Sequence, residues 1–256
     1  MTTREETAAT VAVGTDVAAL VAWLVTVAAW GSAFVGIWLA VYSVALNEAE
    51  RRVDAGTAAM LVNTGPILIA IFAGMFLHEG FPPRLFAGCA VAFCGAVVIG
   101  FATSQSGARS GPGAVLCIVA AFAYAVAVVV QKPVLARVSA FQVTWIGVAA
   151  ATVACLLFAP TLATEAANAD AGTIAWTIYL GAFPTALGFA TWGFALRRTS
   201  AGRMGSLTYL APPVAILLGW AVLGETPPWL AAAGGALCLA GVAQARRRGR
   251  TRARAA

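Results

Sequence analysis

Polar and aromatic residues interrupt the long apolar stretches of this chain, and they are the residues best placed to do chemistry there. They are Trp30, Ser32, Tyr42, Asn63, Tyr124, Thr185, Trp192 and Tyr209. Their hydroxyl, amide and ring groups are suited to lining a cavity for a small organic solute. Each has a structural alternative: a hydroxyl bonded to its own helix, a ring at a membrane interface, or an amide that ties two helices together. We treat them as candidate substrate-binding residues.

The residue types used for catalysis and metal binding do not occur in catalytic or metal-binding patterns. The only histidine, His78, precedes Glu79 without an H-E-x-x-H pattern. No G-x-S-x-G elbow or glycine-rich nucleotide loop follows a strand. The five cysteines lie singly in apolar stretches, without a C-x-x-C pair. We therefore predict no catalytic residues, no metal and no cofactor, and the chain is not expected to be an enzyme.

The composition requires the apolar stretches to meet lipid. Of the 256 residues, 61% are hydrophobic and only 10% are charged, against about 25% charged in soluble domains. A helix of about 20 apolar residues crosses the hydrocarbon layer of a bilayer, and a backbone in lipid must satisfy its own hydrogen bonds. We predict an all-α polytopic membrane bundle with eight spans, at residues 17–46, 57–77, 85–102, 113–130, 140–159, 173–196, 204–223 and 229–245.

Basic residues decide the predicted orientation, because positively charged loops tend to stay in the cytoplasm. Six arginines, from Arg246 to Arg254, follow the last span and place the C-terminus inside. Counting back through eight crossings places the N-terminus inside too, and only Arg51, Arg52 and Arg109 then lie outside. The stretch 161–172, which has no basic residue, is predicted to be an outside loop. We expect a multi-pass protein of the cell inner membrane with both termini cytoplasmic.

The arginine-rich tail, residues 246–256, raises the question of nucleic acid, since such runs also bind phosphates. Its place directly after a span is that of a topology anchor, which contacts anionic lipid. We expect the lipid bilayer as a partner and no nucleic acid.

An internal repeat is the most informative feature of the sequence. Residues 51–95 align without a gap on residues 197–241, with 13 identities in 45. The matches include paired arginines, Pro66 with Pro212, and Glu79 with Glu225, which richness in Ala and Gly does not explain. We expect the two glutamates to cap the helix that follows each, or to mark the interface. Five spans separate the two copies, so the predicted repeat is inverted, as in many secondary transporters.

The repeat also singles out residues near the middle of two spans. Asn63 and Tyr209 are repeat partners, each three residues before a matched proline. Pro66 and Pro212 lack a backbone donor and free a carbonyl one turn earlier. We predict a kink or hinge at each proline, and a bend packed by neighbouring helices is the alternative.

Several stretches resemble the EamA-type transporters of the drug/metabolite transporter superfamily. They are Trp30-Gly31-Ser32, Ala201-Gly202, Tyr209-Leu210-Ala211-Pro212 and Leu223-Gly224-Glu225, and residues 46–66 are similar to one bacterial branch. The resemblance covers nearly the whole chain. It implies ten helices, built as five plus five, that move small organic metabolites or drugs across the inner membrane.

The chain departs from that plan in its first half. Arg197 lies 84 residues after Gly113, at the start of the second half, whereas Arg51 lies only 34 residues after Val17. The first half therefore lacks about two helices. We predict a cytoplasmic segment 1–16, a shortened first repeat 17–105 of about three helices, a second repeat 106–245 of five helices, and the basic tail 246–256.

Two functions stay open on the sequence. The first is an exporter or facilitator that carries small organic metabolites or drugs by alternating access. No acidic residue lies inside a span, which favours facilitated diffusion or exchange over proton coupling. The second is a truncated, transport-incompetent or partner-dependent structural protein, in which another subunit, such as a second copy in a homo-oligomer, covers the gap left by the missing helices.

Overall fold

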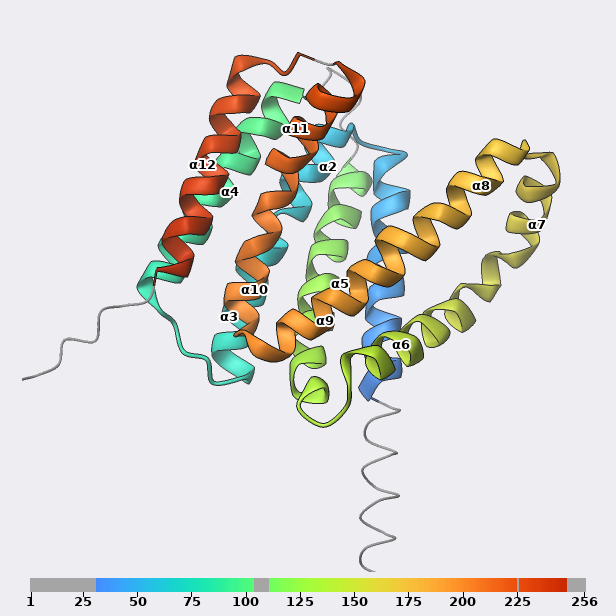
Figure 1. Cartoon of the computed structure of the whole chain (residues 1–256), viewed down its shortest axis with the longest axis horizontal. Coiled ribbons are helices and arrows are strands. Elements are labelled where there is room, and N and C mark those ends of the chain that lie inside the picture. The colour runs from blue at the N-terminus through green and yellow to red at the C-terminus, as the bar shows by residue number, and fades with distance from the viewer. Residues whose placement is uncertain (1–30, 104–110, 225, 248–256) are drawn as a thin grey trace, which may run out of the picture. The chain divides into compact units, whose positions relative to one another are not determined.

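The structure, a computed structural model, describes residues 31–103, 111–224 and 226–247 (Figure 1). Within them the chain folds into helices joined by short connections, without strands. Seven helices are long and apolar enough to span a membrane: Gly31–Glu50, Gly56–Phe76, Pro83–Ala102, Gly111–Leu135, Ala140–Asn168, Ala171–Arg198 and Ala201–Val222. The prediction of an all-α polytopic membrane bundle is confirmed.

Some predicted boundaries differ from the structure. The eighth stretch forms α12 (Trp229–Arg246), which is less apolar than the seven because Gln244 and Arg246 lie in its last turn. The first span continues to Glu50, and its predicted residues 17–30 lie outside the described ones. The predicted loop 161–172 is wrong, because α7 (Ala159–Asn168) is helical and α8 (Ala171–Leu180) follows two residues later.

Side-chain hydrogen bonds explain how the helices extend into that stretch. The Thr164 hydroxyl donates to the carbonyl of Thr161 and the Asn168 amide to that of Thr164. Asp170 caps α8, accepting from both the backbone N–H and the hydroxyl of Thr173. These bonds from Thr173 hold the pKa of Asp170 below its ordinary value. The connection between α7 and α8 therefore consists of Ala169 and Asp170 only.

The chain divides into two compact units. Among the described residues, the first unit comprises residues 31–37 and 133–194, and the second comprises residues 38–103, 111–132, 195–224 and 226–247. The first unit contains α6 (Ala140–Cys155), η1 (Leu156–Phe158), α7, α8, the π-helical η2 (Gly181–Leu187) and most of α9 (Gly188–Arg198). The second contains α2 (Ala55–Val62), α3 (Gly65–Phe76), α4 (Pro83–Thr103), nearly all of α5 (Gly111–Leu135), α10 (Ala201–Leu207), η3 (Thr208–Leu210), α11 (Ala211–Leu223) and α12.

The internal repeat is visible in the second unit as matched helix starts. Asp54 caps α2 by accepting from the N–H of Thr57, and its repeat partner Ser200 caps α10 by accepting from the N–H of Arg203. Both caps have the extended backbone that a helix N-cap requires. The break between α2 and α3 corresponds to the one between α10 and α11.

Glycines bring the repeat partners α4 and α12 into close contact (Figure 1). A Cβ on Gly88 would lie 2.6 Å from the carbonyl oxygen of Gly241, and one on Gly95 would lie 2.5 Å from that of Gly234. The reverse contacts hold too, at 2.5 Å for Gly241 and 2.7 Å for Gly234. Each glycine thus faces the repeat partner of the other, which is the reciprocity that a two-fold axis produces.

This register shows that α4 and α12 run antiparallel, which confirms the inverted repeat. The point midway between the glycine pairs is marked by Ala92 and Cys238, which are themselves repeat partners. The Cys238 thiol donates to the Ala92 carbonyl at 3.3 Å. The pseudo-two-fold axis of the repeat therefore passes between α4 and α12 near these residues.

A second matched position ends the helices before α4 and α12. His78 has φ of 55° and its repeat partner Gly224 has φ of 69°, so both adopt the left-handed conformation that costs an L-residue about 1–2 kcal/mol. His78 is exposed. The two copies of the repeat thus end these helices with the same left-handed turn, which is formed by His78 in the first copy and by Gly224 in the second.

These turns give a matched pair of stability changes. Gly224→Ala is expected to lower the free energy of unfolding by about 1 kcal/mol, because a Cβ in left-handed conformation is strained even in open space. His78→Gly is expected to raise the free energy of unfolding by about 0.5 kcal/mol. The relief of left-handed strain outweighs the larger conformational entropy that glycine loses on folding. Thermal unfolding in detergent measures both, and changes of the same sign would contradict the interpretation.

Candidate functional site

The candidate residues fall in both units. Tyr42, Asn63, Tyr124 and Tyr209 lie in the second unit, whereas Ser32, Thr185 and Trp192 lie in the first. Trp30 lies outside the described residues. The structure brings the four residues of the second unit into two contacting pairs, described next.

The chain breaks its helix just before Pro66. The last bond of α2 runs from the N–H of Asn63 to the carbonyl of Ala59, and the N–H of Thr64 turns back to the carbonyl of Leu61. Pro66 has no N–H, and the N–H of Ile67 bonds to the carbonyl of Thr64. The carbonyl of Asn63 therefore has no N–H partner in its own helix and can accept from a donor on another one.

Tyr209 supplies that donor from the other copy of the repeat. Its hydroxyl donates to the carbonyl oxygen of Asn63 at 2.8 Å, and its side chain is fully buried. Tyr209 lies in η3. The residues three and four positions after it, whose N–H groups would bond to its carbonyl in a continuing helix, are Pro212 and Pro213, which have no N–H. Two repeat partners, each at a broken helix, are therefore joined directly to one another.

The second pair is formed by two aromatic rings. The ring centroids of Tyr42 and Tyr124 lie 5.3 Å apart. Tyr124 also lies against the helix break, because a Cβ placed on Gly65 would be 3.5 Å from its Cδ1. The tyrosine pair and the Tyr209–Asn63 bond therefore flank the same break in the α2–α3 helix.

Further aromatic contacts in the second unit were not predicted. Phe122 packs edge-on against Trp38, with centroids 6.1 Å apart, and against Phe72, with centroids 5.6 Å apart. Phe122 lies two residues before Tyr124 on α5. These rings were missed because phenylalanines in apolar stretches give no signal that separates a cavity wall from lipid-facing packing.

The candidates of the first unit lie in different settings. Ser32 is fully buried, and Trp192 is half-buried. Thr185 is exposed, and its hydroxyl donates to the carbonyl of Leu180 within the π-helical segment that also holds Pro184. The structural alternative, a hydroxyl bonded to its own helix, is what the structure shows for Thr185.

Two charged residues bind backbone groups at the connection between α9 and α10. The Glu79 carboxylate accepts from the N–H groups of Ala201 at 2.6 Å and Gly202 at 3.1 Å. Glu79 therefore caps α10 and not, as the first of its two predicted roles required, the helix that follows it; the second role, marking the membrane interface, stays a prediction. The Lys132 ammonium donates to the carbonyls of Leu196, Arg197 and Thr199 at the end of α9.

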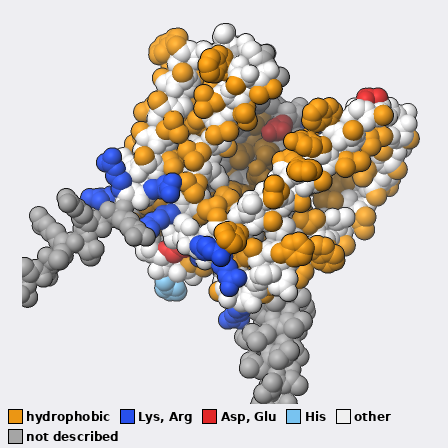
Figure 2. Space-filling view, viewed as in Figure 1, with side chains coloured by type: hydrophobic (Ala, Val, Ile, Leu, Met, Phe, Trp, Pro, Cys, Tyr) orange, Lys and Arg blue, Asp and Glu red, His pale blue; other side chains and the backbone are white. Residues whose placement is uncertain are grey.

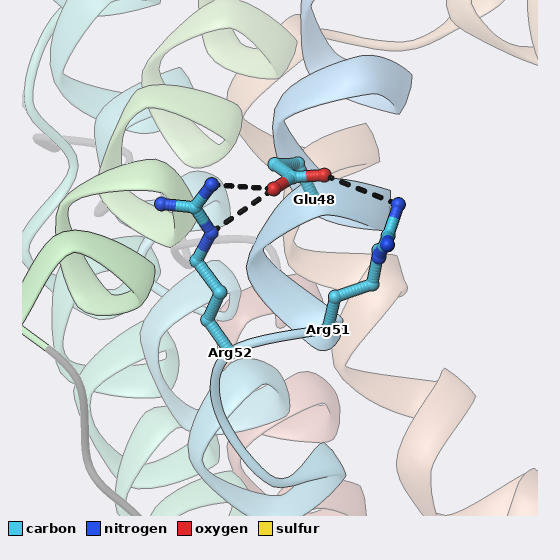
Figure 3. Close-up of polar contacts among 3 residues, drawn as sticks. All are labelled: Glu48, Arg51 and Arg52. Carbon is cyan, nitrogen blue, oxygen red and sulfur yellow. Dashed lines mark hydrogen bonds and ion pairs between the residues drawn. The ribbon is translucent and has the colours of Figure 1, made fainter.

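Other charges lie on the surface of the second unit. Four arginines lie at helix ends: two in the last turn of α9 (Arg197 and Arg198), one in the first turn of α10 (Arg203) and one in the last turn of α12 (Arg246). Figure 2 shows Lys and Arg side chains next to apolar side chains. In the stretch before α2, Glu48 pairs with Arg52 at 2.6 Å and with Arg51 at 3.8 Å (Figure 3). Two of the three basic residues predicted to lie outside are thus paired with an acid.

Comparison with known proteins identifies relatives along most of the chain. The model of the EamA-like transporter family matches residues 10–101 and again residues 111–245, the first match being the shorter. A probable terminal-alkyne amino-acid exporter of Streptantibioticus cattleyicolor is 39% identical over 210 residues, which cover 82% of this chain and 70% of that protein. A probable amino-acid metabolite efflux pump of Salmonella typhimurium is 26% identical over 197 residues, 73% of this chain and 66% of the pump.

A protein of known crystal structure has the same fold. It superposes with a TM-score of 0.69 at 23% identity and covers 87% of this chain and 77% of its own. The relatives are transporters, which fits the expectation of a chain that is not an enzyme. On the family match and the 39% identical exporter, the chain belongs to the EamA-like transporter family and is a multi-pass membrane transporter of small molecules.

Proposed function

We propose that the chain exports small amino-acid-like metabolites across the cell inner membrane by alternating access. Two relatives carry names of this kind, a probable terminal-alkyne amino-acid exporter and a probable amino-acid metabolite efflux pump. An inverted repeat supplies the mechanism, because two equivalent halves can exchange conformations and open a central site to each side in turn. The candidate solute-binding residues are all uncharged and do not indicate the direction of transport. The assignment as an exporter therefore rests on the relatives.

The observation that carries the proposal is the bond between Tyr209 and Asn63 at two repeat-matched helix breaks. Unwound backbone near the middle of a span is tolerated where it lines a cavity or is buried in protein, and transporters place their substrate sites at such breaks. We propose that Tyr42, Tyr124, Asn63 and Tyr209 contribute to the solute site. The other four residues, Trp30, Ser32, Thr185 and Trp192, remain candidates on the sequence alone. Pro66 and Pro212 then act as the hinges.

The proposed domain plan keeps the two repeats at 17–105 and 106–245, between the N-terminal segment and the basic tail. The proposed orientation keeps both termini in the cytoplasm. It is supported by the arginines at the ends of α9 and α12 and by the pairing of Arg51 and Arg52 with Glu48, which reduces the net positive charge of that connection.

Reporter fusions test this orientation. A reporter that is active only in the cytoplasm is expected to be active after Arg137 and after Arg203, and silent after Asp170. The reason is that basic connections stay inside, whereas the short connection at Asp170 carries no basic residue. The opposite pattern of activity would overturn the orientation.

Flux from reconstituted vesicles tests the function. Vesicles are loaded with a panel of a terminal-alkyne amino acid, aliphatic and aromatic amino acids, and a sugar as an unrelated solute, and the efflux is compared with that of protein-free vesicles. We expect protein-dependent efflux of one or more amino acids and none of the sugar. Equal efflux of every amino acid with and without protein would refute the proposal.

A further inference from the structure

The connection between α9 and α10 is held at both ends by charged side chains from other helices. Lys132, on α5, binds the carbonyls of Leu196, Arg197 and Thr199 at the C-terminal end of α9, where a helix runs out of N–H partners four residues further on. Glu79, after α3, binds the first two N–H groups of α10. Each charge is complementary to the helix end that it meets, positive at a C-terminus and negative at an N-terminus. We call these two residues the clamp.

The clamp lies where the chain passes between the two units. The second unit is left directly after Lys132 and is entered again at Ala195. Residues 133–194 are therefore one excursion into the first unit, and Lys132, the last residue before it, binds the carbonyl of Leu196, the second residue after it. All members of the clamp, Glu79 included, belong to the second unit.

The backbone next to the clamp has a built-in weak point. Pro133 follows Lys132 inside α5 and cannot donate to the carbonyl four residues earlier, so the helix loses one bond at the crossing. A fixed residue directly before a weakened one is the arrangement expected of a hinge, since motion concentrates in the few residues that absorb the backbone change.

We propose that Lys132 and Glu79 are positioning residues for transport. They keep the two ends of the excursion together as one pivot on the second unit, about which the first unit turns; the other crossing between the units lies at residues 37–38. This inference rests on the proposed alternating access, but the bonds of the clamp run to backbone groups of residues 196–202 and not to the proposed solute-binding side chains. The clamp therefore governs the rate of the conformational change rather than solute affinity.

Distances between two spin labels test the pivot. One label is placed at Ala167→Cys in the first unit and the other at Thr226→Cys in the second, both exposed positions, in a Cys94→Ala/Cys155→Ala background that leaves the three buried cysteines in place. In Lys132→Met we expect a broadened distance distribution in folded, monodisperse protein. The maximal flux of the amino acid that the wild type transports is expected to fall about ten-fold, because hydrogen bonds from a charged group are lost, with the half-saturating concentration unchanged.

Arg203→Gln is the matched control, since it removes an exposed charge from the first turn of α10, and it is expected to behave as wild type. If Lys132→Met does not fold, Glu79→Gln, which keeps the side-chain shape, gives the same test. A distance distribution and maximal flux equal to wild type in a folded clamp variant would overturn the inference. Should the wild type transport no amino acid, the proposed function fails, while the distance distributions still decide whether the clamp is a pivot.

Discussion

Gly95→Val is expected to destabilise the second unit by about 3 kcal/mol, at the upper end of the usual cost of overpacking. The new Cβ would lie 2.5 Å from the carbonyl oxygen of Gly234 and 2.7 Å from the backbone nitrogen of Cys238. Both are backbone atoms, so α4 and α12 have to move apart along their shared face. Thermal unfolding in detergent micelles is expected to show a clearly lowered melting temperature.

Gly188→Val is the control for this prediction, because a Cβ on Gly188 meets nothing within 4 Å. It measures only the difference in intrinsic helix propensity between valine and glycine, which is below about 1 kcal/mol and favours valine. Similar melting temperatures for the two variants would contradict the close glycine packing of the repeat partners, and with it the placement of the pseudo-two-fold axis between α4 and α12.

Tyr209→Phe is expected to lower both stability and flux. The change removes one hydroxyl and leaves the Asn63 carbonyl at the helix break without the donor that it has in the structure. An unsatisfied buried polar group costs about 1–3 kcal/mol. The lost hydrogen bond joins the two proposed hinge regions, at Pro66 and Pro212. We therefore expect the maximal rate of amino-acid efflux to fall about ten-fold and the melting temperature to fall as well.

Tyr179→Phe provides the comparison on the first unit. Tyr179 is exposed, and its ring contacts Trp176 and Phe183, contacts that phenylalanine keeps. It is expected to leave both the melting temperature and the flux at wild-type values. If Tyr209→Phe also retains both, the bond between the repeat partners does not contribute to the transport core.

The helices and the inverted repeat were predictable because they depend on patterns that the sequence displays. Long uncharged stretches predict spans, and the matches of Pro66 with Pro212 and Gly88 with Gly234 predict duplication. The facing of Gly88 with Gly241 was not predictable, because it depends on which helix faces pack, and a repeat in sequence does not specify the position of its axis. The loop at 161–172 was wrongly predicted because threonine and asparagine side chains bond back to the helix there.

The candidate site was predictable in part. Asn63 and Tyr209 stood out as repeat partners before matched prolines, and the structure joins them by a hydrogen bond. Tyr42 and Tyr124 were named separately, and their contact depends on the packing of α5 against the first helix. Glu79 and Lys132 were missed as a pair because both bind backbone groups, which every residue carries and which no side-chain pattern reveals.

We further propose that a single copy of this chain, whose first match to the family is shorter than its second, is sufficient for transport. Vesicles reconstituted at falling protein-to-lipid ratios test the claim, with amino-acid efflux scored vesicle by vesicle. We expect the fraction of active vesicles to equal the fraction that holds one chain or more. Activity confined to vesicles holding two or more copies, or absent from all of them, would contradict the claim and favour a partner-dependent or transport-incompetent protein.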